Sequence, residues 1–105
     1  MADIEGFFNQ YLPKKLAENP TLAGDINAIY VFDIDGAGAW TVDLTSGEGE
    51  VREGGCDTAG CTVSAKRKDF ETLLDKPASG MMLFTMGKLK VTNVGLALSL
   101  QKLLS

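Results

Sequence analysis

The side chains of this 105-residue sequence that could do chemistry are few. Asp33, Asp35 and Asp43 are carboxylates around a predicted hairpin, and two carboxylates held together can act as general acid and base. Their spacing is also that of the exposed positions of a hairpin, which is the interpretation we favour. The sequence has no histidine, and this excludes the usual Ser-His and Cys-His nucleophiles. Composition leaves Ser-Lys or carboxylate chemistry open, but no motif marks it, and we expect a protein that is not an enzyme.

Cys56 and Cys61 are the two cysteines, separated by four residues. A zinc site normally needs four ligands, and histidine is absent. We expect no metal and no cofactor, and we interpret both cysteines as free thiols, which fits the cytoplasm. Cys61 fits a small apolar position in the core.

The densest positive cluster is Lys66-Arg67-Lys68. A solvated corner between a strand and a helix explains it. The alternative is a contact with lipid headgroups or with an acidic partner, worth about 1 kcal/mol per cation at an anionic membrane. The net charge of −4 and the pI of about 4.6 argue against nucleic-acid binding, which needs a basic face.

Methionine is concentrated in one segment, because three of the four methionines lie at positions 81, 82 and 86 beside Phe84. Methionine fills irregular space and adapts to ligands of different shape. Taken alone, the segment favours ordinary core packing over a ligand-contacting surface.

The elements that must position these side chains can be predicted from periodicity. Apolar residues spaced by three and four predict an amphipathic helix near the N-terminus, with Asp3 as its cap. Its apolar stripe consists of Ile4, Phe7, Phe8, Tyr11 and Leu12. A last helix begins after Asn93, and Leu98 lies off its apolar face.

Alternating apolar residues predict five strands, and turn residues separate them. The strands fall at residues 28–34, 40–44, 48–52, 61–65 and 88–91. Two short helices are expected between the fourth and fifth strands: one ends before Pro77, and the other covers residues 80–86 with Ser79 as its cap. Residues 1–105 thus form a single α/β domain of the α+β kind, with helices on one side of the sheet.

No apolar run approaches the roughly 20 residues that a membrane span needs. The segment from Met1 to Phe8 lacks the positive charge and apolar stretch of a signal peptide, so we expect a cytoplasmic protein.

Several of these segments resemble the sterol carrier protein 2 family. The match to that family's second to fourth strands and following helix involves residues 40–44, 47–51, 61–64, 69–70 and 73. The most specific part is the run from Phe84 to Gln101, which follows the family's Gly-Lys-Leu-Lys strand and Gly-Leu-Ala helix almost position by position.

This resemblance implies a five-stranded mixed, mostly antiparallel sheet in the order 3-2-1-4-5. Helices would cover one face and enclose an apolar tunnel. It also implies a non-catalytic intracellular carrier that binds a fatty acid, fatty acyl-CoA, sterol or similar amphiphile. The alternative is an accessory subunit for an apolar-metabolite pathway such as isoprenoid quinone synthesis.

With this resemblance, we expect the tunnel wall to combine the apolar face of the sheet with residues of the last two helices. The predicted wall residues are Phe32, Trp40, Val42, Met82, Phe84, Met86, Leu96 and Leu100. Expected partners are the lipid, a possible enzyme of lipid or quinone metabolism, and a membrane. Because the chain is acidic, we expect membrane contact to be weak, transient and apolar, through Leu98 or Leu104.

Overall fold

The computed structural model describes residues 3–45, 47 and 49–104, without the side chains of residues 77 and 100–104. Five strands form one sheet in the order β3-β2-β1-β4-β5, as predicted. β1 runs parallel to β4, and the other neighbours are antiparallel. The strands are β1 (Ile29–Asp35), β2 (Gly38–Asp43), β3 (Glu50–Glu53), β4 (Cys61–Lys66) and β5 (Leu89–Val91).

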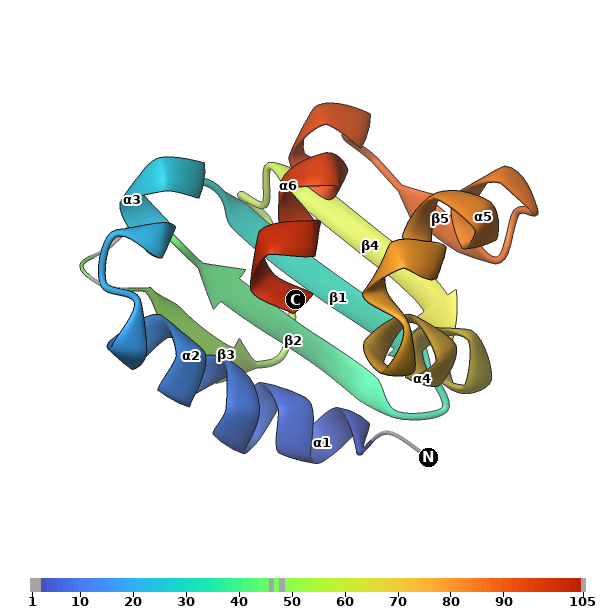
Figure 1. The fold of residues 1–105 in the computed structure, drawn as a ribbon, viewed down its shortest axis with the longest axis horizontal. Coiled ribbons are helices and arrows are strands. Elements are labelled where there is room, and N and C mark those ends of the chain that lie inside the picture. The colour runs from blue at the N-terminus through green and yellow to red at the C-terminus, as the bar shows by residue number, and fades with distance from the viewer. Residues whose placement is uncertain (1–2, 46, 48, 105) are drawn as a thin grey trace.

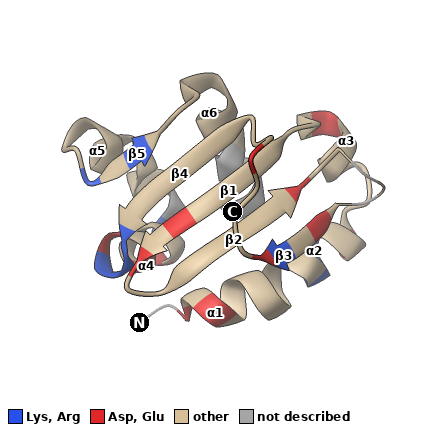
Figure 2. Cartoon of the chain, turned by 180° about the vertical axis from the view of Figure 1, so that it is seen from behind, with Lys and Arg blue, Asp and Glu red and all other residues tan. Residues whose placement is uncertain are grey.

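The helices lie on one face of this sheet (Figure 1), and Figure 2 shows the opposite face toward the viewer. No helix in the described part of the chain is long and apolar enough to cross a membrane. The helical segments are α1 (Ile4–Gly6), η1 (Phe7–Tyr11), α2 (Leu12–Glu18), α3 (Leu22–Ile26), α4 (Arg67–Asp75), η2 (Pro77–Ser79), α5 (Gly80–Thr85) and α6 (Val94–Leu104).

Alternation along the central strand separates the two faces of the sheet. In β1, Tyr30, Phe32 and Ile34 are buried under the helices, while Asp33 and Asp35 are exposed on the open face. Strand residues point alternately to opposite faces, so the pattern seen in the sequence decides which face receives the core. The turn to β2 closes with the backbone N–H of Ala37 donating to the carbonyl of Ile34, at 3.0 Å.

The N-terminal helix has one turn that the sequence did not predict. Asp3 caps it as expected, accepting from the N–H of Gly6 at 3.1 Å. η1 is a π-helical turn, in which the N–H of Leu12 bonds to the carbonyl of Phe7, five residues earlier. The wider turn holds an extra residue and shifts the following positions around the axis. Tyr11, predicted to face inward, is therefore 49 % exposed, although Phe7, Phe8 and Leu12 are buried.

The caps of the later helices agree only in part with prediction. Asn93 caps α6, accepting from the N–H of Leu96 at 3.1 Å. Ser79 does not cap α5, because its hydroxyl donates instead to the carbonyl of Lys76 at 2.6 Å. Leu98 lies off the packing face of α6, as predicted, and is exposed.

Candidate functional site

A continuous apolar layer lies between the sheet and its helices. At its centre Phe8 stacks on Trp40 of β2, with ring centroids 4.6 Å apart, and on Phe70 of α4 at 5.7 Å. Phe32 of β1 lies 5.1 Å from Phe8. We use the term buried layer for this aromatic cluster together with the strand residues packed around it. Its main members are Phe8, Tyr30, Phe32, Trp40, Val42, Cys61, Val63 and Phe70.

The buried layer holds little polarity. Among the described residues the buried polar or charged side chain is Thr41, which faces the opposite side of the sheet and donates to the carbonyl of Gly54 at 2.7 Å. The indole N–H of Trp40 is buried and has no hydrogen-bond partner in the described part of the protein. An unpaired buried donor is costly, so this N–H lowers the stability of the fold.

Tyr30 ties α6 to the centre of the sheet. Its hydroxyl donates to the backbone carbonyl of Leu96 at 2.6 Å. Burial, together with a smaller effect of the negative charge of an ionised Cys61, raises the pKa of Tyr30 to about 12, and a hydrogen bond with Ser99 acts in the opposite direction. The neutral phenol therefore anchors α6 over the layer at all but strongly alkaline pH.

This anchor predicts an alkaline loss of stability. The pKa of Tyr30 is about 12 in the folded protein against 10.0 for an ordinary tyrosine. Between pH 10 and pH 12 the folded protein keeps the phenol proton of Tyr30, whereas the unfolded chain releases it. The contribution of Tyr30 to the free energy of unfolding is therefore complete below about pH 10 and is lost as the pH rises toward 12. Thermal unfolding of wild type and Tyr30→Phe, compared at pH 8 and pH 11, checks this. The difference in melting temperature between wild type and Tyr30→Phe should be smaller at pH 11 than at pH 8. An unchanged difference would mean that Tyr30 ionises as readily as in the unfolded chain.

The structure brings some of the predicted wall residues together. Phe32, Trp40 and Val42 lie in the buried layer, each at most 3 % exposed. Leu96 of α6 is half-buried and packs against that layer. The side chain of Leu100 lies outside the described residues.

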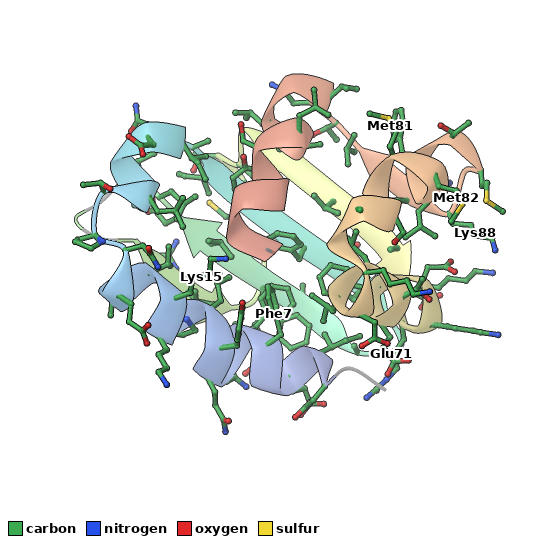
Figure 3. All side chains as sticks on the ribbon, viewed as in Figure 1. Phe7, Lys15, Glu71, Met81, Met82 and Lys88 are labelled. Carbon is green, nitrogen blue, oxygen red and sulfur yellow. The ribbon has the colours of Figure 1, made fainter. Side chains whose placement is uncertain are left out.

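The predicted residues of α5 lie elsewhere. Met82 and Met86 are 56 % and 57 % exposed, and Phe84 is 39 % exposed. Figure 3 shows Met81 and Met82 on the outer side of α5, away from the sheet. Leu83, which the wall prediction omitted, is the residue of α5 that is buried. These exposed side chains could meet a ligand at the edge of the buried layer but not at its centre.

The prediction also missed the aromatic residues that the helices contribute. Phe8 and Phe70 are fully buried and occupy the centre of the layer. The signal was present, because both residues belong to apolar stripes with helical spacing. A stripe identifies the face of a helix that is buried, but it does not show which strand residues that face will meet.

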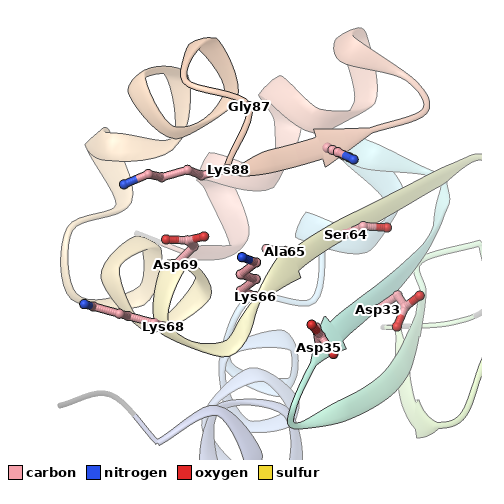
Figure 4. Close-up of a pocket in the computed structure, with 10 residues that line it drawn as sticks. Asp33, Asp35, Ser64, Ala65, Lys66, Lys68, Asp69, Gly87 and Lys88 are labelled. Atoms are coloured by element: carbon pink, nitrogen blue, oxygen red, sulfur yellow. The ribbon is translucent and has the colours of Figure 1, made fainter.

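A groove of about 660 Å³ lies around the ends of β1, β4 and β5 (Figure 4). We call it the polar groove, because charged side chains make up most of its lining. The lining consists of Asp33, Asp35, Ser64, Ala65, Lys66, Lys68, Asp69, Gly87, Lys88 and Lys90. This composition does not suit an apolar ligand.

Of the three carboxylates considered for catalysis, Asp33 and Asp35 line the polar groove, but Asp43 lies apart from them. Asp33 pairs with Ala39 near the tip of the β1–β2 hairpin, whereas Asp43 pairs with Ile29 at its other end. Hydrogen bonds from the hydroxyl and the N–H of Thr45 lower the pKa of Asp43. In the described part of the chain, no three metal-ligating side chains form a group.

Both cysteines carry free thiols, as predicted. Cys61 is fully buried in β4, and burial raises the pKa of its thiol. Its position is that of a small apolar core residue.

Comparison with known proteins gives one matching family and several similar structures. The profile of the SCP-2 sterol transfer family matches residues 8–105. The peroxisomal multifunctional enzyme A of Dictyostelium discoideum is 32% identical over 93 residues, which cover 84% of this chain. The matched region is 21% of that enzyme, so the chain spans about a fifth of the length of this relative.

The fold is shared with several solved structures. Sterol carrier protein 2 from Yarrowia lipolytica, in its apo form, has a TM-score of 0.72 and 28% identity, covering 95% of this chain and 81% of that one. A structure described as a UbiJ-SCP2 ubiquinone synthesis protein has a TM-score of 0.68 and 13% identity, covering 98% of this chain and 93% of that one. At such low identity the second match shows the fold alone.

Proposed function

Because the chain belongs to the SCP-2 sterol transfer family, we propose that it is a non-catalytic carrier that holds a lipid between its sheet and α6. The observation that carries this proposal is the buried layer, which continues from the N-terminal helix across the sheet to Leu96. A site without ionised groups takes up an apolar chain, because the hydrophobic effect drives association and no buried charge has to be desolvated.

Phe32, Trp40, Val42, Leu96 and Leu100 would form the inner wall. The first three are buried on the sheet, and α6 is held above them by the hydrogen bond from Tyr30 to Leu96. The exposed positions of Met82, Phe84 and Met86 suit contact with the part of a ligand that reaches the surface. We therefore propose that the wall has an inner part and a rim.

The polarity of the buried layer indicates how an amphiphile would be oriented. The layer offers the unpartnered N–H of Trp40 but no buried charge among the described residues. A carboxylate or phosphate headgroup buried there would lose its hydration without a counter-charge. The apolar chain would therefore lie inside, with the headgroup at the rim. Fatty acids, fatty acyl-CoA and sterols all fit this description.

An accessory role in isoprenoid quinone synthesis is the second candidate. It is favoured by the shared fold of the ubiquinone synthesis protein. In this case the buried layer would hold a polyprenyl group, and the protein would act beside an enzyme of that pathway. That partner enzyme and a cytoplasmic location stay predictions.

A titration tests the carrier function. Delipidated protein is expected to bind a fluorescent fatty acid saturably and to change the fluorescence of Trp40, which lies inside the layer. Ala97→Leu should weaken this binding more than it weakens folding, because Ala97 is half-buried against the layer and a larger side chain would fill ligand space. The control is Leu98→Trp, followed through the fluorescent fatty acid alone, which enlarges a side chain one residue away on the exposed side of α6.

Equal weakening by both variants would contradict a ligand site under α6, and a folded, delipidated wild type that binds nothing would exclude the carrier function. Mass spectrometry of an organic extract of the purified protein separates the two candidates. A fatty acid or sterol supports the carrier, and a prenylated aromatic compound supports the accessory role.

A further inference from the structure

α5 presents an apolar surface to solvent. Its buried residue is Leu83, which anchors the helix, while Met81, Met82 and Met86 are each more than half exposed and Phe84 is 39 % exposed. Large apolar side chains gathered on a surface mark a binding site more often than isolated ones do. Met81, Met82 and Phe84 lie in this six-residue helix and Met86 directly follows it, and side chains exposed in this way contribute little to folding.

Positive charge gathers at the same end of the molecule. Residues 66–90 contain six Lys or Arg and three Asp or Glu, a net charge of +3, although the whole chain carries −4. The remaining residues therefore carry −7. Figure 2 shows the basic residues over α4, the turn before β5 and β5 itself. The overall acidity of the chain conceals a basic region.

Four of these cations line the polar groove: Lys66, Lys68, Lys88 and Lys90. Among the described residues, none of them forms a salt bridge, whereas Arg67 pairs with Glu71 at 3.9 Å. Asp33, Asp35 and Asp69 also line the groove and reduce its net charge to +1. The lysines are exposed, so they can reach outward past these carboxylates. Lysine chains can extend to place their ammonium groups in water or at a headgroup.

The apolar and basic residues belong to adjoining elements. α5 packs against β5, and Lys88 lies in the turn between them. Met82 and Lys88 lie at the same end of the protein in Figure 3. We call the combined surface the α5–β5 face; it consists of Met81, Met82, Phe84, Met86, Lys66, Lys68, Lys88 and Lys90.

We propose that the α5–β5 face docks on an anionic bilayer. Apolar side chains beside exposed lysines are the combination that binds at the boundary between headgroups and acyl chains. The lysines would meet lipid phosphates while the methionines and Phe84 enter the outer acyl region. This inference rests on the proposed function for its purpose, because a carrier must meet the membrane from which it takes its lipid. The proposed docking surface differs from the weak apolar contact through Leu98 or Leu104 that the sequence predicted. It also adds an electrostatic attraction to the membrane.

Vesicle binding tests the proposal with the full chain. Large vesicles of phosphatidylcholine with about one third phosphatidylserine are expected to bind the protein, and vesicles of phosphatidylcholine alone should bind it much less. Raising NaCl from about 0.1 M to about 0.5 M should weaken binding, because salt screens exposed charges. Lys88→Glu with Lys90→Glu should weaken it at least about tenfold. Met81→Ser with Met82→Ser should weaken it at both salt concentrations.

The matched control is Lys14→Glu with Lys15→Glu, which makes the same change of net charge on α2 and should leave most of the binding intact. The proposal is overturned if wild type ignores the phosphatidylserine vesicles, which would leave an acidic protein as the partner. It is also overturned if the control loses as much binding as the Lys88/Lys90 variant.

Fatty-acid titration without vesicles, run on wild type and on the Lys88/Lys90 variant, keeps the two proposals apart, because neither lysine belongs to the proposed ligand wall. If a variant loses vesicle binding but keeps fatty-acid binding, its residues act in docking through the α5–β5 face and not in holding the lipid. A wild type that binds vesicles but no fatty acid would refute the carrier function and leave the docking face standing.

Discussion

Replacing Phe8 by alanine is expected to lower the free energy of unfolding by about 3–5 kcal/mol. Phe8 is fully buried, and its ring lies within 6 Å of the rings of Trp40, Phe32 and Phe70. Its removal would leave a cavity that three rings from three separate elements cannot all close. Urea unfolding followed by circular dichroism measures the loss without relying on Trp40.

Tyr11→Ala on the same turn is the control for this substitution. Tyr11 is 49 % exposed, although its ring stacks on Phe7 at 5.5 Å, so we expect a loss of about 1 kcal/mol or less. A loss at Phe8 as small as that at Tyr11 would show that the ring borders free space. The ligand space would then extend to the N-terminal helix.

The second large effect is expected in α5, where two neighbouring residues should behave differently. Leu83→Ala should cost about 2–5 kcal/mol, because Leu83 is 4 % exposed and is the anchor of this helix. Met82→Ala should cost less than about 1 kcal/mol, because most of that side chain already contacts water. The same unfolding measurement on both variants tests this.

The outcome decides what the methionines do. A cost near that of Leu83 for Met82→Ala would place Met82 in the packed core and would remove it from the α5–β5 face. A small cost together with weaker vesicle binding would support a surface role. If Leu83→Ala left stability unchanged, α5 would not be anchored as the structure describes.

Much of the fold was predictable because the sheet has one buried face. Trp40 and Val42 alternate with polar neighbours, and this pattern places the strand within two residues of its observed bounds. α3 was missed because its five residues are too few to show a helical period. The π turn was missed because its hydrogen bonds, five residues apart, leave no mark on composition.

The candidate site was predictable only where a strand fixed the direction of the side chain. Phe32, Trp40 and Val42 could be assigned to the inner face because strand positions alternate strictly. Met82 and Met86 could not be placed, because a six-residue helix with apolar residues on every side does not show which one faces the sheet. Charge was predictable only in part: the sequence shows the cluster Lys66-Arg67-Lys68, but only the fold brings Lys88 and Lys90 to the same groove.

The parallel pairing at the centre of the sheet has a consequence for synthesis on the ribosome. Tyr30 of β1 pairs with Cys61 of β4, 31 residues later, whereas the hairpin with β2 needs only its own short turn. A ribosome adding roughly 5–20 residues per second leaves the far edge of β1 unpaired for a few seconds. During that interval the strand exposes backbone hydrogen-bonding groups beside Tyr30 and Phe32, a template for misassociation. The nascent chain is therefore most vulnerable to aggregation between the emergence of β2 and that of β4.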